Sequence, residues 1–245
     1  MTKRIFAVLL ALCVLFSAVL CCADEFADDW DELDSLDDEE ESDGMAEFDE
    51  EEDKVDFRTM SYGIKTDRYH GFGYKLNEDG TGLILTCYEG YEEDVGGNVA
   101  FPAEIEGIPV VLIENGMCDS NPLLVNIEIP GSVTMIGNNA FAHCPNLKSV
   151  KICEGTTYIG FCSFGGCPEL ENIQLPESLV TVDNFAFAMS AKIPEVVFGS
   201  KLETIGKQAF FGCTALSRSV IPGGDSVTVA EDAFIGCAEN FAIEN

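Results

Sequence analysis

Cysteine and histidine are the residues of this chain best suited to chemistry, because thiolates and imidazoles act as nucleophiles and metal ligands. The chain has 11 cysteines and two histidines, His70 and His143. A zinc site needs three or four ligands at characteristic spacing, and His143 with Cys162 and Cys167 does not provide it. The sequence contains no Cys-x-x-Cys, Gly-x-Ser-x-Gly, P-loop or dinucleotide-binding fingerprint. We therefore predict no catalytic residue, no metal site and no cofactor, and a protein that is not an enzyme.

The spacing of the cysteines points to architecture instead. Four of them form a column: Cys144, Cys167, Cys213 and Cys237. The first step is 23 residues, the second is twice 23 because Ser190 occupies the position between, and the last is 24. Residues stacked in this way lie about 4.8 Å apart and point in the same direction, whereas a disulfide needs Cβ atoms about 3.8 Å apart that face each other. We therefore expect these cysteines to be small buried hydrophobic residues. The state of Cys87, Cys118, Cys153 and Cys162 is left open.

The same period of 23 residues governs the apolar positions. Three columns share it: Phe141, Phe164, Phe187, Phe210 and Phe234; Ile136, Ile159, Val182, Ile205 and Val229; Leu124, Leu147, Leu170, Ile193 and Leu216. Such a period is typical of a solenoid, in which each unit buries its apolar columns against the next unit. We predict about five to six repeats over residues 113–245.

Each repeat begins with an alternating segment, such as Val150-Lys151-Ile152, that has the two-residue period of a half-buried strand. A bend and a second short apolar segment follow, and the Ala-Phe segment has room for about one turn of helix. The predicted fold class is a mainly β solenoid with short helical or 3-10 turns in each coil. The segment Phe241-Ala242-Ile243 is predicted to be a terminal strand.

Residues 57–112 are less regular and are predicted to form an amino-terminal β cap. Residues 74–86 read as strand, Asp-Gly turn and strand, and residues 105–113 as a turn that leads into another strand. A hairpin at this place covers the first coil, whose open edge and core would otherwise invite aggregation.

The first 56 residues have the character of export and linker segments. Residues 1–23 combine Lys3 and Arg4 with an apolar run and small residues, which predicts a secretory signal peptide. The alternatives are a retained anchor and a lipid attached to Cys21 or Cys22, the one membrane link we expect. Residues 24–56 contain 20 acidic residues and one lysine, so we expect a disordered acidic linker.

The charge of the whole chain excludes some partners. Its formal net charge is −31, and acidity of this size repels nucleic acid and anionic lipid surfaces. We therefore expect a protein partner and no nucleic acid.

The strand alternation also identifies a surface. Residues between the buried positions of each first strand point outward and, once stacked, form one ribbon, which we call the strip. The strip consists of Asn126, Glu128, Ser149, Lys151, Asn172, Gln174, Glu195, Val197, Arg218 and Val220. The alternatives are an ordinary solvated face and a protein-binding surface, and its mixed charge with exposed valines favours protein over polyanion.

One repeat unit, residues 127–147, resembles the BspA-like leucine-rich repeat in nearly every column, from Ile127-Glu-Ile129-Pro130 to Ala140-Phe141 and Cys144. The resemblance covers about residues 72–245. Ser190, Asp183 and Ser219 depart from it at a cysteine, a glycine and an apolar position, and are expected to weaken their coils locally.

The resemblance implies a secreted or surface-displayed protein of bacteria or host-associated protists, with relatives linked to adhesion to matrix proteins or cells. It implies no shared catalytic residues. The expected function is therefore protein–protein interaction or adhesion at the cell surface. The alternative is a structural, self-assembling protein of the cell envelope without a host ligand.

Overall fold

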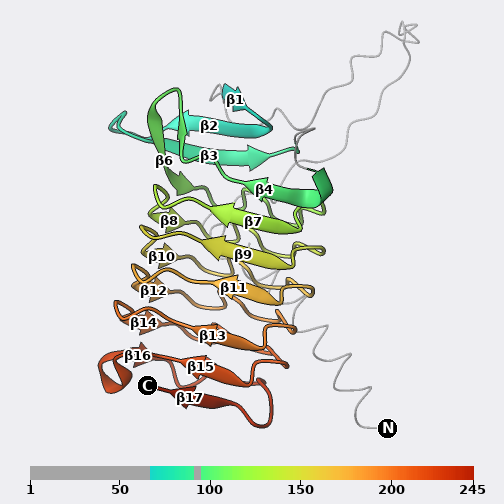
Figure 1. Cartoon of the computed structure of the whole chain (residues 1–245), viewed down its shortest axis with the longest axis vertical. Coiled ribbons are helices and arrows are strands. Elements are labelled where there is room, and N and C mark those ends of the chain that lie inside the picture. Colours follow the sequence, from blue (N-terminus) through green and yellow to red (C-terminus); the bar gives the residue numbers. More distant parts are fainter. Residues whose placement is uncertain (1–66, 91–94) are drawn as a thin grey trace, which may run out of the picture. The chain divides into compact units, whose positions relative to one another are not determined.

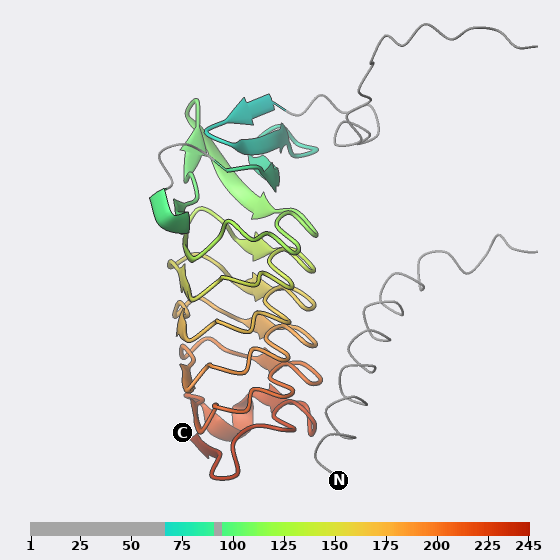
Figure 2. The ribbon, with the colours of Figure 1, turned by 90° about the vertical axis from the view of Figure 1, so that its right-hand side faces the viewer.

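The computed structural model describes residues 67–90 and 95–245, which form a β-solenoid with strands on two sides of each coil (Figures 1 and 2). The predicted signal peptide, acidic linker and lipid-anchor cysteines lie outside the described residues. The leucine-rich repeat solenoid expected from the 23-residue period is thus confirmed for the part that the structure describes.

The first side of the stack, which we call the long-strand face, carries two parallel sheets. Four strands form the first sheet: β4 (Asn98–Ala100), β7 (Asn126–Ile129), β9 (Ser149–Ile152) and β11 (Asn172–Gln174). Three strands form the second: β13 (Glu195–Val197), β15 (Arg218–Val220) and β17 (Ala242–Glu244). The terminal strand predicted around Ala242 is therefore confirmed.

The second side, the short-strand face, belongs to one sheet that runs from the cap through every coil. Its strands in spatial order are β1 (Asp67–Tyr69), β2 (Phe72–Leu76), β3 (Leu83–Tyr88), β6 (Ile108–Ile113), β8 (Met135–Ile136), β10 (Tyr158–Ile159), β12 (Thr181–Val182), β14 (Thr204–Ile205) and β16 (Thr228–Val229), with β5 (Glu104–Ile105) paired to β6. From β3 onward the neighbours along this order are parallel.

The predicted hairpin cap is present. Strands β2 and β3 are antiparallel, and Gly80 adopts a left-handed φ of 71° in the turn between them. The Asp79 carboxylate accepts hydrogen bonds from the Thr81 amide at 2.9 Å and from its hydroxyl at 2.5 Å, which lowers the pKa of Asp79. The second predicted turn, at Glu106 and Gly107, joins β5 to β6 with φ of 54° and 81°.

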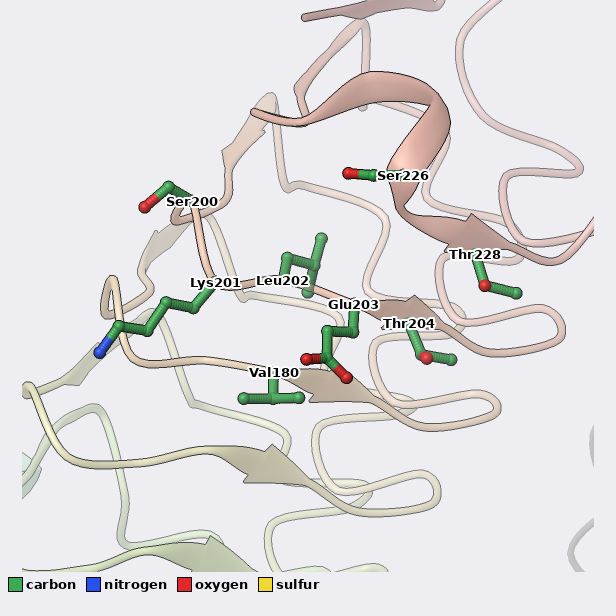
Figure 3. A pocket seen from close by; sticks show the side chains of 8 residues that line it. All are labelled: Val180, Ser200, Lys201, Leu202, Glu203, Thr204, Ser226 and Thr228. Carbon is green, nitrogen blue, oxygen red and sulfur yellow. The ribbon is translucent and has the colours of Figure 1, made fainter.

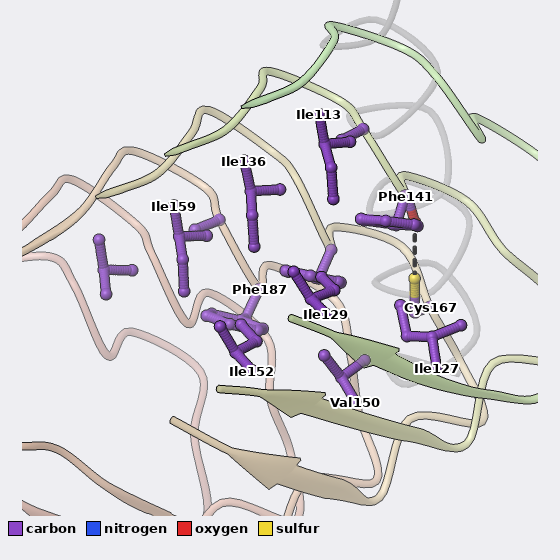
Figure 4. Close-up of a cluster of buried hydrophobic side chains, with 14 of the residues drawn as sticks. Ile113, Ile127, Ile129, Ile136, Phe141, Val150, Ile152, Ile159, Cys167 and Phe187 are labelled. Carbon is purple, nitrogen blue, oxygen red and sulfur yellow. Dashed lines mark hydrogen bonds between the residues drawn. The ribbon is translucent and has the colours of Figure 1, made fainter. Parts of the chain in front are cut away.

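A column of stacked phenylalanine rings fills the centre of the solenoid. Phe141, Phe164, Phe187 and Phe210 have no exposed surface, and the centroids of neighbouring rings lie 5.1 to 5.3 Å apart. The isoleucine column packs beside them (Figure 4). A fully buried aromatic side chain removes more apolar area from water than an aliphatic one, so each phenylalanine of this column makes a large contribution to hydrophobic stabilisation.

The third side of each coil, which contains the Ala-Phe segment, does not form the turn of helix for which it has room. The segment is a series of tight turns, and the two 3-10 helices found among the described residues, η2 (Val95–Gly97) and η3 (Gly224–Ser226), lie elsewhere. Alternate residues donate to the following coil, as when the amides of Asn139, Phe141 and His143 donate to carbonyls 161, 163 and 165 at 2.8 Å. This pattern requires left-handed backbone at Asn139 and His143, with φ near 55°.

All eight cysteines of the described residues are free, and Cys144, Cys167 and Cys213 are fully buried. They do more than fill space, because each thiol of the column donates to a carbonyl of the preceding coil. The Cys167 thiol lies 3.2 Å from the Phe141 carbonyl oxygen (Figure 4), and the Cys213 thiol lies 3.2 Å from that of Phe187. Burial raises the pKa of Cys213 well above its usual range, so its thiol keeps its proton.

Two departures from the repeat keep good hydrogen bonding. The Ser190 hydroxyl replaces a thiol and donates to the Phe164 carbonyl at 2.8 Å. The Asp183 carboxylate accepts from its neighbour's amide at 2.6 Å and from the Tyr158 hydroxyl at 2.5 Å. We expected these two residues to weaken their coils, but both side chains form hydrogen bonds.

Ser219 behaves differently. Its side chain is fully buried in an apolar column of the long-strand face, and its hydroxyl has no hydrogen-bond partner among the described residues. A buried hydroxyl without a partner costs about 1–3 kcal/mol, so the weakening expected at this position has a physical basis.

Candidate interaction surface

Within each of its two sheets, the long-strand face brings the strip residues into two rows, because neighbouring strands pair in parallel with a constant register. The first row contains Asn126, Ser149 and Asn172, then Glu195 and Arg218. The second row contains Glu128, Lys151 and Gln174, then Val197 and Val220. The side chains are exposed except for Ser149, Arg218 and Val220, which are half-buried.

The same register lengthens both rows beyond the strip that the sequence identifies. Asn98 and Ala100 of β4 lie beside Asn126 and Glu128 at one end. Ala242 and Glu244 of β17 lie beside Arg218 and Val220 at the other end. These four residues escape the 23-residue period because β4 precedes β7 by 28 residues and β17 follows β15 by 24. Pairing of strands rather than spacing is the signal that finds them.

Charged side chains of the strip pair along the stack, from one coil to the next. The Lys151 ammonium lies 2.7 Å from the Glu128 carboxylate, and its hydrogen bond lowers the pKa of Glu128 and raises that of Lys151. The Arg218 guanidinium contacts Glu244 at 2.9 Å and Glu195 at 3.1 Å, which raises its own pKa and lowers that of Glu244. Exposed pairs of this kind stabilise a fold little, so they organise the surface more than they hold the coils together.

The two halves of the strip differ in chemistry. The half on β7, β9 and β11 is rich in amides, and the Asn126 amide donates to the Asn98 side-chain oxygen at 2.6 Å. The half on β13 and β15 exposes Val197, with 50% of its surface accessible, next to the arginine with its two carboxylates. An apolar centre with a charged margin is the composition of protein-binding surfaces.

The division between the halves coincides with a break in hydrogen bonding. Within the described residues, no ladder joins β11 to β13, so the long-strand face consists of two sheets. Pro194 occupies the position that Glu171 has one coil earlier, where the Glu171 amide donates to Lys148 at 3.0 Å. Proline has no amide hydrogen and cannot make this bond.

Outside the strip, the residues with chemical potential are dispersed. His143 is an exposed turn residue, with Nδ1 3.1 Å from an Asp119 carboxylate oxygen. Among the described residues, no group of three or more His, Cys, Asp or Glu side chains is placed to hold a metal ion. No described helix has the length and hydropathy needed to cross a membrane.

A stack of short parallel strands with rows of outward side chains is the architecture of a leucine-rich repeat protein. Residues 112–240, more than half of the chain, match the BspA type leucine-rich repeat region in six copies. The chain belongs to this family. Repeat proteins of this kind are generally binding scaffolds rather than enzymes.

Two solved structures are similar over most of the described residues. A leucine-rich cell surface protein of Faecalibacterium prausnitzii is 25% identical with a TM-score of 0.59, and the match covers 74% of this chain and 50% of that one. The leucine-rich repeat protein of T. pallidum is 29% identical with a TM-score of 0.51, and the match covers 73% and 71% of the two chains. This chain thus spans half the length of the first relative. None of the curated proteins compared with it matches.

Proposed function

We propose that this chain is an exported protein that binds a protein partner through the strip, in adhesion or interaction at the cell surface. The observation that carries the proposal is the register of β7, β9, β11, β13 and β15, which gathers ten outward side chains of mixed chemistry into two rows. The similar protein of Faecalibacterium prausnitzii is described as a cell surface protein, which supports the location. Export by the signal sequence and a lipid at Cys21 or Cys22 belong to the same proposal.

The chemistry of the strip supports a protein over a polyanion. Acidic residues outnumber basic ones by 44 to 13 in the chain, and the basic residues Lys151 and Arg218 of the strip are each held by carboxylates. A phosphate or sulfate chain would meet net repulsion, whereas a protein surface can match paired charges and cover the two valines.

A triple substitution tests the strip. Replacing Lys151, Gln174 and Arg218 by alanine removes a donor from each of β9, β11 and β15 and is expected to weaken binding to a matrix protein that binds the wild-type chain at least about tenfold. The melting temperature should change little, because all three side chains lie at the surface. Surface plasmon resonance against a panel of matrix and cell-surface proteins at physiological salt measures the effect.

The matched control replaces three polar residues that lie outside the strip, Lys148, Glu171 and Lys207, by alanine. It should leave binding unchanged. Equal binding by the wild-type protein and the strip variant would remove the strip as the binding surface.

A structural, self-assembling role remains the second candidate, and one observation favours it. The strand β17 exposes Ile243 at 50%, and the turn segment after β16 exposes Ile235 at 54%. Exposed strand edges with apolar side chains promote pairing with another chain. Sedimentation velocity decides between the two: concentration-dependent oligomers without binding to any panel protein would support the structural role.

A further inference from the structure

The repeat is broken at one place by an extra residue. Corresponding positions Ile205 and Val229 are 24 residues apart, where the preceding steps are 23. The chain turns at Gly223, whose φ of 103° lies in the left-handed region, and forms the 3-10 helix η3 in place of the plain turn of the other coils. The irregularity lies at the corner between the long-strand and short-strand faces.

An open hollow of about 630 Å³ lies beneath η3, and we call it the corner pocket (Figure 3). It lies between the turn that precedes β14, Val180 of the coil before, and the η3 coil. The residues that line it are Val180, Ser200, Lys201, Leu202, Glu203, Thr204, Ser226 and Thr228.

The pocket contains a carboxylate that the fold does not use. Glu203 is exposed and forms no ion pair or side-chain hydrogen bond with any residue that the structure describes. One, two and three coils earlier its column contains Val180, Thr157 and Thr134, all uncharged. Lys201 also lines the pocket, but its ammonium extends away from the Glu203 carboxylate (Figure 3). The coil with the additional residue is therefore adjacent to the coil that has a charged residue, Glu203, in this column.

Apart from Lys201, the rest of the lining complements a cation with an aliphatic stem. The Ser226 hydroxyl donates its hydrogen to the Gly223 carbonyl at 2.9 Å, so its lone pairs are the part available to a ligand. Thr204 and Thr228 add two hydroxyl oxygens. Leu202, only 4% exposed, and the half-buried Val180 provide an apolar wall for methylene groups.

We propose that the corner pocket binds a basic side chain, the ammonium of lysine or the guanidinium of arginine, presented by a protein partner. The Glu203 carboxylate pairs with the charge, the hydroxyl oxygens accept the remaining hydrogen bonds, and Val180 with Leu202 covers the stem. The excess of acidic over basic residues in the chain adds long-range attraction for such a partner. This site is separate from the strip and does not depend on it.

The test uses the full chain and two probes of equal shape, acetyl-Gly-Arg-Gly-amide and the same peptide with neutral citrulline for arginine. Methyl resonances of Val180 and Leu202 are followed by NMR during titration. We expect saturable shifts with a millimolar dissociation constant for the arginine peptide and about threefold weaker binding of the citrulline peptide, since an ion pair with an exposed carboxylate adds only a small factor to the affinity.

Glu203→Gln keeps the shape of the side chain and is expected to lower the affinity for the arginine peptide about threefold, because the pair is exposed. The control Glu171→Gln removes an exposed carboxylate elsewhere and should leave it unchanged. Equal binding of both peptides, equal weakening by both variants, or no shift of the two methyl groups would overturn the proposal. The strip variant should keep the wild-type response, so failure of one site is distinguishable from failure of the other.

Discussion

The cysteines of the column act both as small buried residues and as hydrogen-bond donors. Its members are buried and free, as the spacing predicts, yet each occupies a site that requires a hydrogen-bond donor as well as a small volume. Ser190 satisfies both requirements, since its hydroxyl reaches the Phe164 carbonyl at 2.8 Å. Serine and cysteine share this geometry and differ mainly in the strength of the donor.

The need for a donor at this position predicts different effects on stability for two substitutions of Ser190. Ser190→Cys should change the free energy of unfolding by less than about 1 kcal/mol, because a donor remains. Ser190→Ala should lower it by about 1–3 kcal/mol, because the buried Phe164 carbonyl loses its side-chain partner. Urea denaturation followed by circular dichroism measures both. An alanine variant as stable as the cysteine variant would show that only the volume matters.

At the scale of the element, β15 carries the least favourable residue of the core. Neighbouring strands place Val196 and Ile243 in the same column, while β15 places the hydroxyl of Ser219 there without a partner. The strand retains its register with β13 and β17 despite this. Its stability therefore comes from the ladder and from the residues on either side rather than from this position.

Ser219→Val is accordingly expected to raise the free energy of unfolding by about 1–3 kcal/mol, since it removes an unpaired hydroxyl and adds apolar contact. The matched control is Ser163→Val. The Ser163 hydroxyl is equally buried, but its oxygen lies 2.7 Å from the Gly160 carbonyl oxygen and 2.8 Å from that of Gly137. Its single hydrogen is donated to one of these two acceptors, so its loss should destabilise the protein. Thermal unfolding distinguishes the two. A Ser219→Val protein that melts below wild type would contradict the account.

Regular elements were the part of this fold that the sequence could predict. The strand in Val150-Lys151-Ile152, the Asp79-Gly80 hairpin and the solenoid itself follow from local periodicity and turn chemistry. The third side could not be predicted in detail, because its turns depend on hydrogen bonds to the next coil and not on helix propensity. The corner pocket could not be predicted either, because the 24-residue step in the sequence shows where a residue is added but not which conformation the added residue produces.

For the whole molecule, the break between β11 and β13 divides the long-strand face into two hydrogen-bonded blocks. The short-strand sheet and the phenylalanine column run through both blocks without interruption. The two blocks are thus joined by the short-strand sheet, by the turn segments of the third side and by the core, and only the long-strand face has no ladder between them in the described residues. Local opening concentrates where backbone hydrogen bonds are missing.

Hydrogen exchange should reveal this division. The amide of Val197 in β13 is expected to exchange faster than the amide of Gln174 in β11, which lies in an intact ladder. Pro194→Ala restores the missing amide and should slow exchange in β13, whereas Pro145→Ala, in a turn of an earlier coil, should have no effect there. Equal protection of β11 and β13 in the wild-type protein would mean that the break has no dynamic consequence.

The rows of backbone amides on the third side, which donate to the following coil, affect how such a molecule can change its length. Amides of one coil always meet carbonyls at the same positions of the following coil, from Cys118 onward to Phe210. A 23-residue cassette could therefore be duplicated or deleted by recombination without creating a mismatched junction. Each cassette would alter the reach of the molecule by one strand spacing, about 4.8 Å. Length is in this sense a property that evolution can adjust in steps, independently of the chemistry displayed on any one coil.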